Sequence, residues 1–245
     1  MGNYSVHSLF STIQGEGYHA GRRAIFVRLA GCNAWNGRPE GRAKGKGACS
    51  KWCDTAFVGG DAYTTERLCA CIEEQWACFE GHPRVVLTGG EPALQIDEEL
   101  MDALHARRYH VAVETNGSVA FYRPVDTWVT CSPKRGMPLV LQYANELKVV
   151  LPGGDPNDPT DLGWTYDELR GLCEHFGGIG HRWVQPQDPI RAVLGETHLT
   201  QGGRKDLGTE SSVQYARNVN ACLDVVKRDP RWRIGVQGHK LLGLA

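Results

Sequence analysis

Three cysteines in one irregular stretch are the residues best suited to chemistry. Cys32, Cys49 and Cys53 lie in a Gly-rich segment after a predicted strand, with sixteen residues between the first two and three between the last two. A loop of this kind can hold three thiolates around one inorganic centre and direct backbone N–H groups at the sulfurs. Three cysteines on a [4Fe–4S] cluster leave one iron open to a cofactor or substrate. Zinc is the competing metal, although no fourth Cys or His stands nearby in sequence to complete a tetrahedral site.

The remaining cysteines are predicted to serve packing, as small buried hydrophobes. Cys71 falls on the apolar stripe of a predicted helix, and Cys131 ends a strand, where core and ligand roles stay open. The chain has nine cysteines, an odd number, and its N-terminal segment lacks the basic and then apolar order of a secretory signal. We therefore expect a cytoplasmic protein without a disulfide framework. The six packing cysteines are Cys69, Cys71, Cys78, Cys131, Cys173 and Cys222.

Strands that alternate with helices must position these groups. Near-continuous apolar runs indicate strands covered on both faces, as in parallel sheets, and apolar residues at helical spacing recur between them. Thr165 and Glu168 match a capping box at the start of the third helix. We expect one α/β domain over residues 1–245, with loop insertions at 33–48 and 195–212. Strands are predicted at 24–30, 84–88, 109–115, 127–131, 146–151, 182–185 and 233–237, and helices around 68–79, 100–104, 165–176 and 216–226.

Polar segments follow four of the predicted strands: TGGEP (88–92), ETNG (114–117), CSPK (131–134) and QPQD (185–188). In parallel α/β folds, functional groups collect at the carboxyl ends of the strands. Arg28 lies inside an apolar strand, which is costly unless the charge is paired. A guanidinium suits bidentate binding of a substrate carboxylate, and a structural ion pair is the alternative.

Composition excludes two classes of partner. The 245 residues carry a formal net charge of −1, which predicts no strong attraction to nucleic acid or to an anionic membrane. No apolar run approaches the ~18 residues that span a bilayer.

Taken together, these motifs resemble the radical S-adenosylmethionine superfamily, and within it the 7-carboxy-7-deazaguanine synthase family. The resemblance spans nearly the whole chain. The cysteine spacing departs from the family pattern, so that Cys49 is assigned as the only candidate left near Cys32 and Cys53. The matching segments are TIQGEG (12–17), FVRLAGCN (26–33), CDTAFVGG (53–60), TGGEP, ETNG, CSPK, ELKVV (146–150), QPQD and QGHKLLGLA (237–245).

The resemblance implies a partial (β/α) barrel, largely parallel, with a [4Fe–4S] cluster at its mouth. It implies a carbon–nitrogen lyase that contracts 6-carboxy-5,6,7,8-tetrahydropterin to 7-carboxy-7-deazaguanine with loss of ammonia, for queuosine-type tRNA modification. The cluster reduces S-adenosylmethionine to start a radical reaction in that family, and Mg²⁺ assists. A flavodoxin-like electron donor and a homodimer complete the expected partners. The basic loop from Arg38 to Lys51 could dock that donor, and composition favours the alternative of a solvated loop.

The resemblance also implies site residues. For the cofactor these are Trp52, Cys53, Asp54, Gly89, Gly90, Glu91, Ser132, Pro133, Lys134, Gln185, Pro186, Gln187 and Asp188. For the substrate they are Ile13, Gln14, Gly15, Glu16, Arg28, Thr88, Glu114, His239 and Ala245, with Thr55 on Mg²⁺. Without the resemblance, residues 14–16 read as an exposed turn, Thr55 as a cap or turn residue, Lys134 as a surface lysine, and His239 as structural or exposed.

Two other functions remain open. A glycyl-radical activase would share the cysteines and GGEP, but it would not need TIQGEG, Arg28 or a C-terminal tail over the substrate. A zinc-stabilised binding module would carry no iron.

Overall fold

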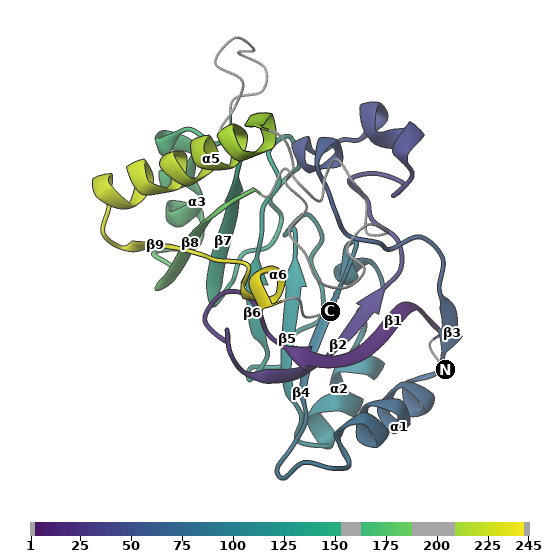
Figure 1. Cartoon of the computed structure of the whole chain (residues 1–245). Helices are drawn as coiled ribbons and strands as arrows, with labels where there is room; N and C mark the ends of the chain where they lie inside the picture. The colour runs from purple at the N-terminus through teal and green to yellow at the C-terminus, as the bar shows by residue number, and fades with distance from the viewer. Residues whose placement is uncertain (1–2, 153–162, 188–208, 243–245) are drawn as a thin grey trace.

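The computed structural model describes residues 3–152, 163–187 and 209–242. Nine strands form one sheet in the order β3-β1-β2-β4-β5-β6-β7-β8-β9, and Figure 1 shows the helices around it. The strands are β1 (Tyr4–Ile13), β2 (Arg23–Leu29), β3 (Asp61–Tyr63), β4 (Arg84–Gly89), β5 (His110–Thr115), β6 (Trp128–Cys131), β7 (Glu146–Leu151), β8 (His181–Pro186) and β9 (Trp232–Ile234). The helices are α1 (Thr65–Trp76), α2 (Glu98–Ala106), α3 (Tyr166–His175), α5 (Thr209–Arg228) and α6 (Gly238–Leu242), with short 3₁₀ helices η1 (Pro39–Lys44), η2 (Ala48–Lys51) and η3 (Pro92–Leu94).

The predicted parallel sheet is confirmed. Neighbours from β2 through β4 to β9 all pair in parallel. Only β1 pairs antiparallel, with β2 and with β3. Strand β1 was not predicted, because its apolar residues are separated by Ser and His and form no continuous run. The nine strands therefore consist of a parallel α/β sheet extended by an antiparallel edge.

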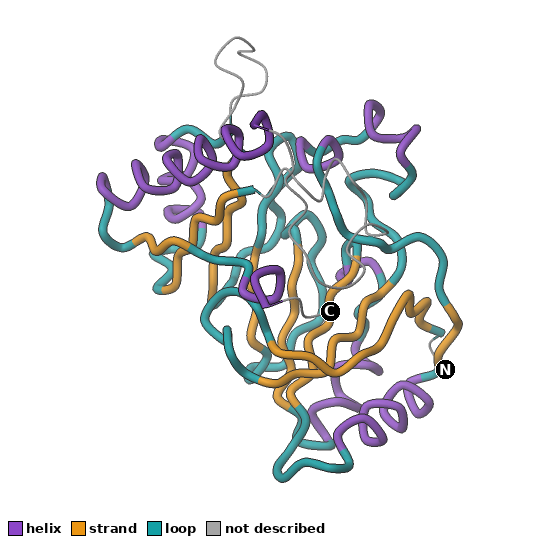
Figure 2. Tube along the Cα trace, viewed as in Figure 1, coloured by secondary structure: helices purple, strands orange, loops and turns teal. Residues whose placement is uncertain are grey.

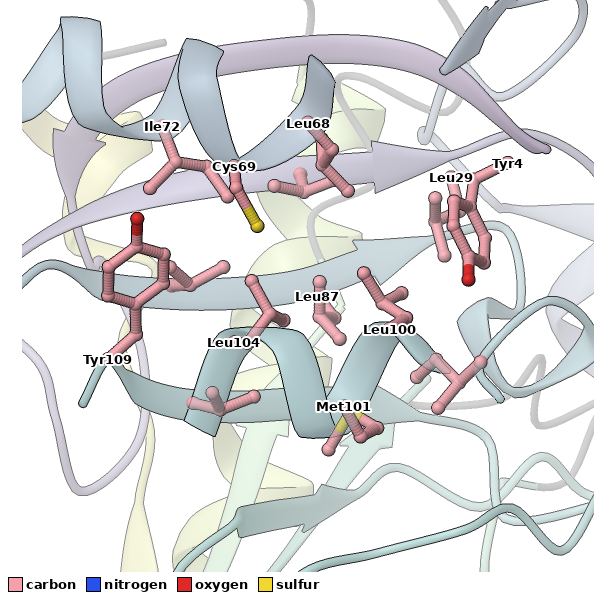
Figure 3. Close-up of a cluster of buried hydrophobic side chains, with 14 of the residues drawn as sticks. Tyr4, Leu29, Leu68, Cys69, Ile72, Leu87, Leu100, Met101, Leu104 and Tyr109 are labelled. Carbon is pink, nitrogen blue, oxygen red and sulfur yellow. The ribbon is translucent and has the colours of Figure 1, made fainter. Parts of the chain in front are cut away.

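Apolar side chains on one face of the sheet pack against the helices. One cluster joins β2, β4 and β5 to α1 and α2, with Leu87, Leu100 and Leu104 at its centre (Figure 3). A second joins β6, β7 and β8 to α3 and α5. Figure 2 shows these two helix pairs at opposite ends of the sheet. Alternate residues on each strand point to the opposite face, called here the inner face.

Several predictions about helices and cysteines need correction. Helix α1 ends at Trp76, so that Phe79 is not on it and lies 42% exposed. Its buried cysteine is Cys69 rather than Cys71, and Cys78, beyond the helix, is exposed. The predicted loop at 195–212 ends early because α5 begins at Thr209, and residues 195–208 lie outside the described part of the chain. Burial of the core cysteines Cys131, Cys173 and Cys222 is confirmed.

The capping box predicted at α3 is present and gives a stability test. The Thr165 side chain accepts from the Glu168 backbone N–H, and the Glu168 side chain accepts from the Thr165 backbone N–H. Thr165→Ala should lower the free energy of unfolding by about 1 kcal/mol, measured by urea denaturation. Thr165→Ser keeps the acceptor and should restore stability. Equal stability of the Ala and Ser variants would contradict a contribution from the cap.

Candidate active site

The three predicted ligand cysteines belong to one apolar cluster of side chains. Cys49 is buried on η2 with Trp35 and Phe57, and Cys32 and Cys53 pack against the same cluster. The Cys53 N–H donates to the Cys49 carbonyl at 2.7 Å, which fixes the turn between them. The Cys32 sulfur accepts from a backbone N–H, that of Ala34, at 3.4 Å. Backbone N–H donors at cysteine sulfurs are a feature of iron–sulfur sites.

The thiols also influence one another electrostatically. Burial raises the pKa of Cys49 to about 11, Lys134 opposes the shift, and Cys53 and Cys32 add to it. Within the described residues, no three His, Cys, Asp or Glu side chains are arranged to hold a single metal ion. An iron–sulfur cluster requires a wider spacing of the thiolates than a single metal ion does, because each thiolate binds a different iron. The donor set and its apolar, N–H-bearing surroundings fit a [4Fe–4S] cluster.

The GGEP segment lies directly beside the first cysteine. Gly89 has φ 150°, and a Cβ there would collide with the Leu29 carbonyl. A Cβ on Gly90 would collide with the Gly31 carbonyl and approach the Cys32 side chain. Glycine is thus required at both positions for the end of β4 to approach the cysteine loop this closely.

Glu91 joins GGEP to ETNG. Its carboxylate is fully buried and accepts from the Thr115 hydroxyl at 2.6 Å and from the backbone N–H groups of Asn116 at 2.6 Å and Ala93 at 3.0 Å. Burial raises the pKa of Glu91, and these three donors oppose the rise. The Asn116 amide donates in turn to Asn33, next to Cys32. The carboxylate thereby ties two strand ends to the cysteine loop.

This arrangement predicts a stability loss for Glu91→Gln. A glutamine amide must turn its NH₂ group toward one of the three donors, which leaves a buried N–H unsatisfied. The free energy of unfolding of the metal-free protein should fall by about 2 kcal/mol, measured by urea denaturation. The matched change Glu98→Gln, at an exposed position on α2, should have little effect. A glutamine variant as stable as the wild type would contradict the acceptor-only role.

The CSPK segment reaches the cysteine loop from the other side. The Ala48 N–H donates to the Arg135 carbonyl at 2.9 Å, and a Cβ on Gly47 would lie near both Cys49 and Lys134. Ser132 and Gln185 are buried, and the Ser132 hydroxyl and the Gln185 carbonyl oxygen have no hydrogen-bond partner among the described residues. Buried polar atoms without a partner indicate a ligand, which fits the implied cofactor.

Four other predicted cofactor residues are described by the structure: Trp52, Pro133, Pro186 and Gln187. Trp52 packs against the cysteine cluster. Pro186 ends β8, and the Gln187 carbonyl accepts from Asn218 on α5. Pro133 is buried beside Ser132. Asp188 lies outside the described residues.

Predicted substrate residues share the inner face of the sheet. Arg28 pairs in register with Thr88, and Glu114 pairs with Thr130, which pairs with Glu146. Leu87 pairs with Val113, so Thr88 and Glu114 are the next residues on adjacent strands. The Arg28 guanidinium donates to the Ala56 carbonyl at 3.5 Å. Arg28 therefore lies beside the segment that contains Thr55.

A buried lysine that the sequence reasoning missed joins two of these residues. Lys148, on β7, lies 2.7 Å from a Glu16 oxygen and 2.9 Å from a Glu114 oxygen. Its side chain is 9% exposed. Gln14 donates to Glu114 at 3.2 Å. The signal was the same as for Arg28, a cation within a run of apolar strand residues.

The C-terminal segment closes over this group. The Gly238 N–H donates to the Gly15 carbonyl at 2.9 Å, and Gln237 donates to Glu16 at 2.8 Å. His239 Nδ1 lies 4.0 Å from Glu16. On α6, Lys240 forms an ion pair of 2.7 Å with Asp54, beside Cys53. Residues 14–16 are therefore held in a tertiary contact and are not the free exposed turn considered above.

For two predicted substrate residues the described part of the structure gives no contact with the charged group around Lys148. Ile13 ends β1, paired with Arg23. Ala245 lies outside the described residues. Gln237 and Lys240 were not predicted, since no local pattern distinguishes them from surface residues.

The fold and the site define a class of protein: an α/β protein whose parallel sheet carries a cysteine-bearing loop next to a charged site on its inner face. Membership of a particular family follows from sequence. The chain is 39% identical to the 7-carboxy-7-deazaguanine synthase of Burkholderia multivorans, over 98% of this chain and 99% of that protein. It is 38% identical to that of Bradyrhizobium diazoefficiens and 32% identical to that of Escherichia coli, each over 99% of both chains. The chain belongs to the 7-carboxy-7-deazaguanine synthase family.

Comparison of structures supports the fold. The crystal structure of QueE from Escherichia coli superposes with a TM-score of 0.62 at 23% identity, covering 97% of this chain and 95% of that one. No protein-family model matches the chain. Among the described residues, no helix is both long and apolar enough to cross a membrane.

Proposed function

We propose that this protein is a 7-carboxy-7-deazaguanine synthase, which contracts the ring of 6-carboxy-5,6,7,8-tetrahydropterin with loss of ammonia. The observation that carries the proposal is the placement of Arg28, Glu16 and Glu114 on one inner face, beside the segment that follows Cys53. Full-length similarity to proteins of that name supports it. The reaction belongs to the carbon–nitrogen lyases.

Each half of the site has a role in this proposal. Cys32, Cys49 and Cys53 hold a [4Fe–4S] cluster, which when bound supplies the electron that cleaves S-adenosylmethionine in a radical reaction. Gly89, Gly90 and Glu91 meet the methionine moiety of that cofactor. Ser132, Pro133, Lys134 and Gln185 to Asp188 line its ribose and adenine side, together with Trp52, Asp54 and the backbone near Cys53.

The substrate lies deeper, on the inner face. Arg28 binds its carboxylate, and Thr55 would be a ligand of Mg²⁺, which would offset the negative charge there. Gln14, Gly15, Glu16 and Glu114 accept from the N–H donors of the pterin edge, with Ile13 and Thr88 alongside. His239, which lies near Glu16, covers it.

The wider setting is part of the proposal. The product would serve queuosine-type tRNA modification in the cytoplasm. A flavodoxin-like protein would deliver the electron, and two chains would form a homodimer. The reaction makes a free base, so the enzyme needs no nucleic-acid site, in keeping with a net charge of −1.

Turnover under anaerobic conditions tests the function. The reconstituted protein should convert carboxytetrahydropterin to carboxydeazaguanine when S-adenosylmethionine and a reductant are present, followed by chromatography and mass spectrometry. Omission of S-adenosylmethionine is the control and should abolish the product. A colourless protein that contains zinc and no iron would contradict the proposal and favour the binding module.

A further inference from the structure

Lys148 is the most deeply buried cation of the inner face, and neither the cysteine loop nor the cofactor side uses it. Its ammonium bridges two carboxylates that belong to different parts of the chain, Glu16 after β1 and Glu114 on β5. All three side chains are at most 17% exposed. Burial of an unpaired ammonium is strongly unfavourable. The two carboxylates therefore have to supply the attraction that offsets the desolvation of Lys148.

The bridge controls the charge of Glu16. Burial alone would raise the pKa of Glu16, but the charge and hydrogen bond of Lys148 outweigh it and lower that pKa to about 2. Burial alone would lower the pKa of Lys148, but Glu114 and Glu16 raise it. Both shifts favour the charged pair throughout the neutral range. Other titratable groups near the bridge are Glu146 on β7, His19 after β1 and Arg84 on β4, which line the same cavity as Glu16 and Glu114, and His239 on α6, which approaches Glu16.

We propose that Lys148 is a positioning residue that keeps Glu16 ionised and holds Glu16 and Glu114 at a fixed separation, so that the inner face selects a heterocycle edge made of N–H donors. An ionised carboxylate accepts hydrogen bonds and donates none. Gln14 reinforces this pattern, because its carbonyl oxygen is buried without a hydrogen-bond partner among the described residues. A 2-amino-4-oxopyrimidine edge, as in a pterin, presents the matching donors. The inference rests on the proposed function and adds the residue that sets its specificity.

The sign of the pH effect follows from the bridge. In the wild type, Glu16 stays ionised far below neutral pH. Without Lys148, two buried carboxylates lie close together with their main cation removed, and each raises the pKa of the other. The pair should then hold a proton near neutral pH and lose it only as the pH rises. Activity should follow the loss of that proton.

Kinetics of Lys148→Met and Lys148→Arg test this proposal. At neutral pH, Lys148→Met should lower kcat/KM for the carboxytetrahydropterin about 100-fold, mainly through KM, and should regain activity toward about pH 9 while the wild-type profile stays flat there. Lys148→Arg keeps the charge and should remain within about 10-fold of the wild type. The matched control Lys227→Met removes an exposed lysine of α5 and should change neither value. A Lys148→Met enzyme with the wild-type pH profile overturns the proposal.

A second test uses the folded wild type and therefore does not require that Lys148→Met folds. Infrared spectra at about pH 5, where a free carboxyl begins to protonate, should contain no protonated-carboxyl band that disappears in Glu16→Gln. Such a band would overturn the proposal even if Lys148→Met failed to fold. Wild-type turnover in the same assays keeps the two inferences separate: no product from the wild type contradicts the proposed function, whereas normal wild-type turnover with an unaltered Lys148→Met profile contradicts only the role of Lys148.

Discussion

Replacement of Cys49 by serine should abolish both the iron–sulfur chromophore and turnover. Cys49 is the ligand whose spacing from Cys32 and Cys53 departs from the family, and in the structure it lies in the same apolar cluster as these two. Serine is a poor iron ligand at neutral pH, because its hydroxyl keeps its proton where a thiol gives its proton up. Activity should fall by more than about 10⁴-fold, since the cofactor carries the difficult chemistry. The measurements are iron and sulfide content after anaerobic reconstitution, visible absorbance, and product yield.

Cys222→Ser provides the matched control for this experiment. Cys222 is buried between α5 and the sheet, far from the cysteine loop in the core. Its serine variant should lose some stability and still bind a full complement of iron. If Cys49→Ser kept a normal cluster, a different residue would have to be the third ligand, and the assignment of the loop would be wrong.

Arg28→Ala should have the second largest effect, a loss of about 30- to 4,000-fold in kcat/KM for the pterin. Removal of one partner from a buried charge pair costs about 2–5 kcal/mol, and each 1.4 kcal/mol is a factor of ten. Arg28 also donates to the Ala56 carbonyl, so its loss releases the segment next to Thr55. Steady-state kinetics at saturating S-adenosylmethionine measure the effect. Arg28→Lys should recover only part of it, because an ammonium cannot bind a carboxylate in the bidentate mode.

Arg23→Ala is the control on the same strand. Arg23 begins β2, donates to Ser11 at 2.8 Å and lies over the Phe79 ring at 3.1 Å from its centroid. These contacts lie at the end of the strand away from the cysteine loop. The variant should lose stability and keep its KM for the pterin. Full turnover by Arg28→Ala would eliminate the substrate-carboxylate role.

The parallel core of the fold could be predicted from sequence, because a strand buried on both faces is a continuous run of apolar residues. Runs such as RVVLT at 84–88 and HVAVET at 110–115 carry Val, Leu or Ala at most interior positions, which is the pattern of a strand covered on both faces. Strand β1 lies at the antiparallel edge, with most of its residues only partly buried, and its alternating polar residues hid it. The end of α1 was misplaced because Phe79 continues the helical spacing after the chain has left the helix.

The site was predictable where a residue type conflicts with its surroundings. Arg28 is a charge within an apolar strand, and that conflict identified it. Lys148 presents the same conflict in ELKVVL and was passed over, because no partner for it was visible along the chain. Its partners, Glu16 and Glu114, are 132 and 34 positions away. Lys240 and Gln237 lie in the matching segment QGHKLLGLA, but nothing distinguished them individually, since their roles depend on where α6 docks.

The contacts of α6 have a consequence for how the molecule assembles. Gln237 and Glu16 are 221 positions apart, and a contact of such sequence separation forms late, because the intervening chain must first be ordered. During synthesis Glu16 and Lys148 leave the ribosome well before their last partner exists. The inner face should therefore remain open to solvent until the final helix arrives.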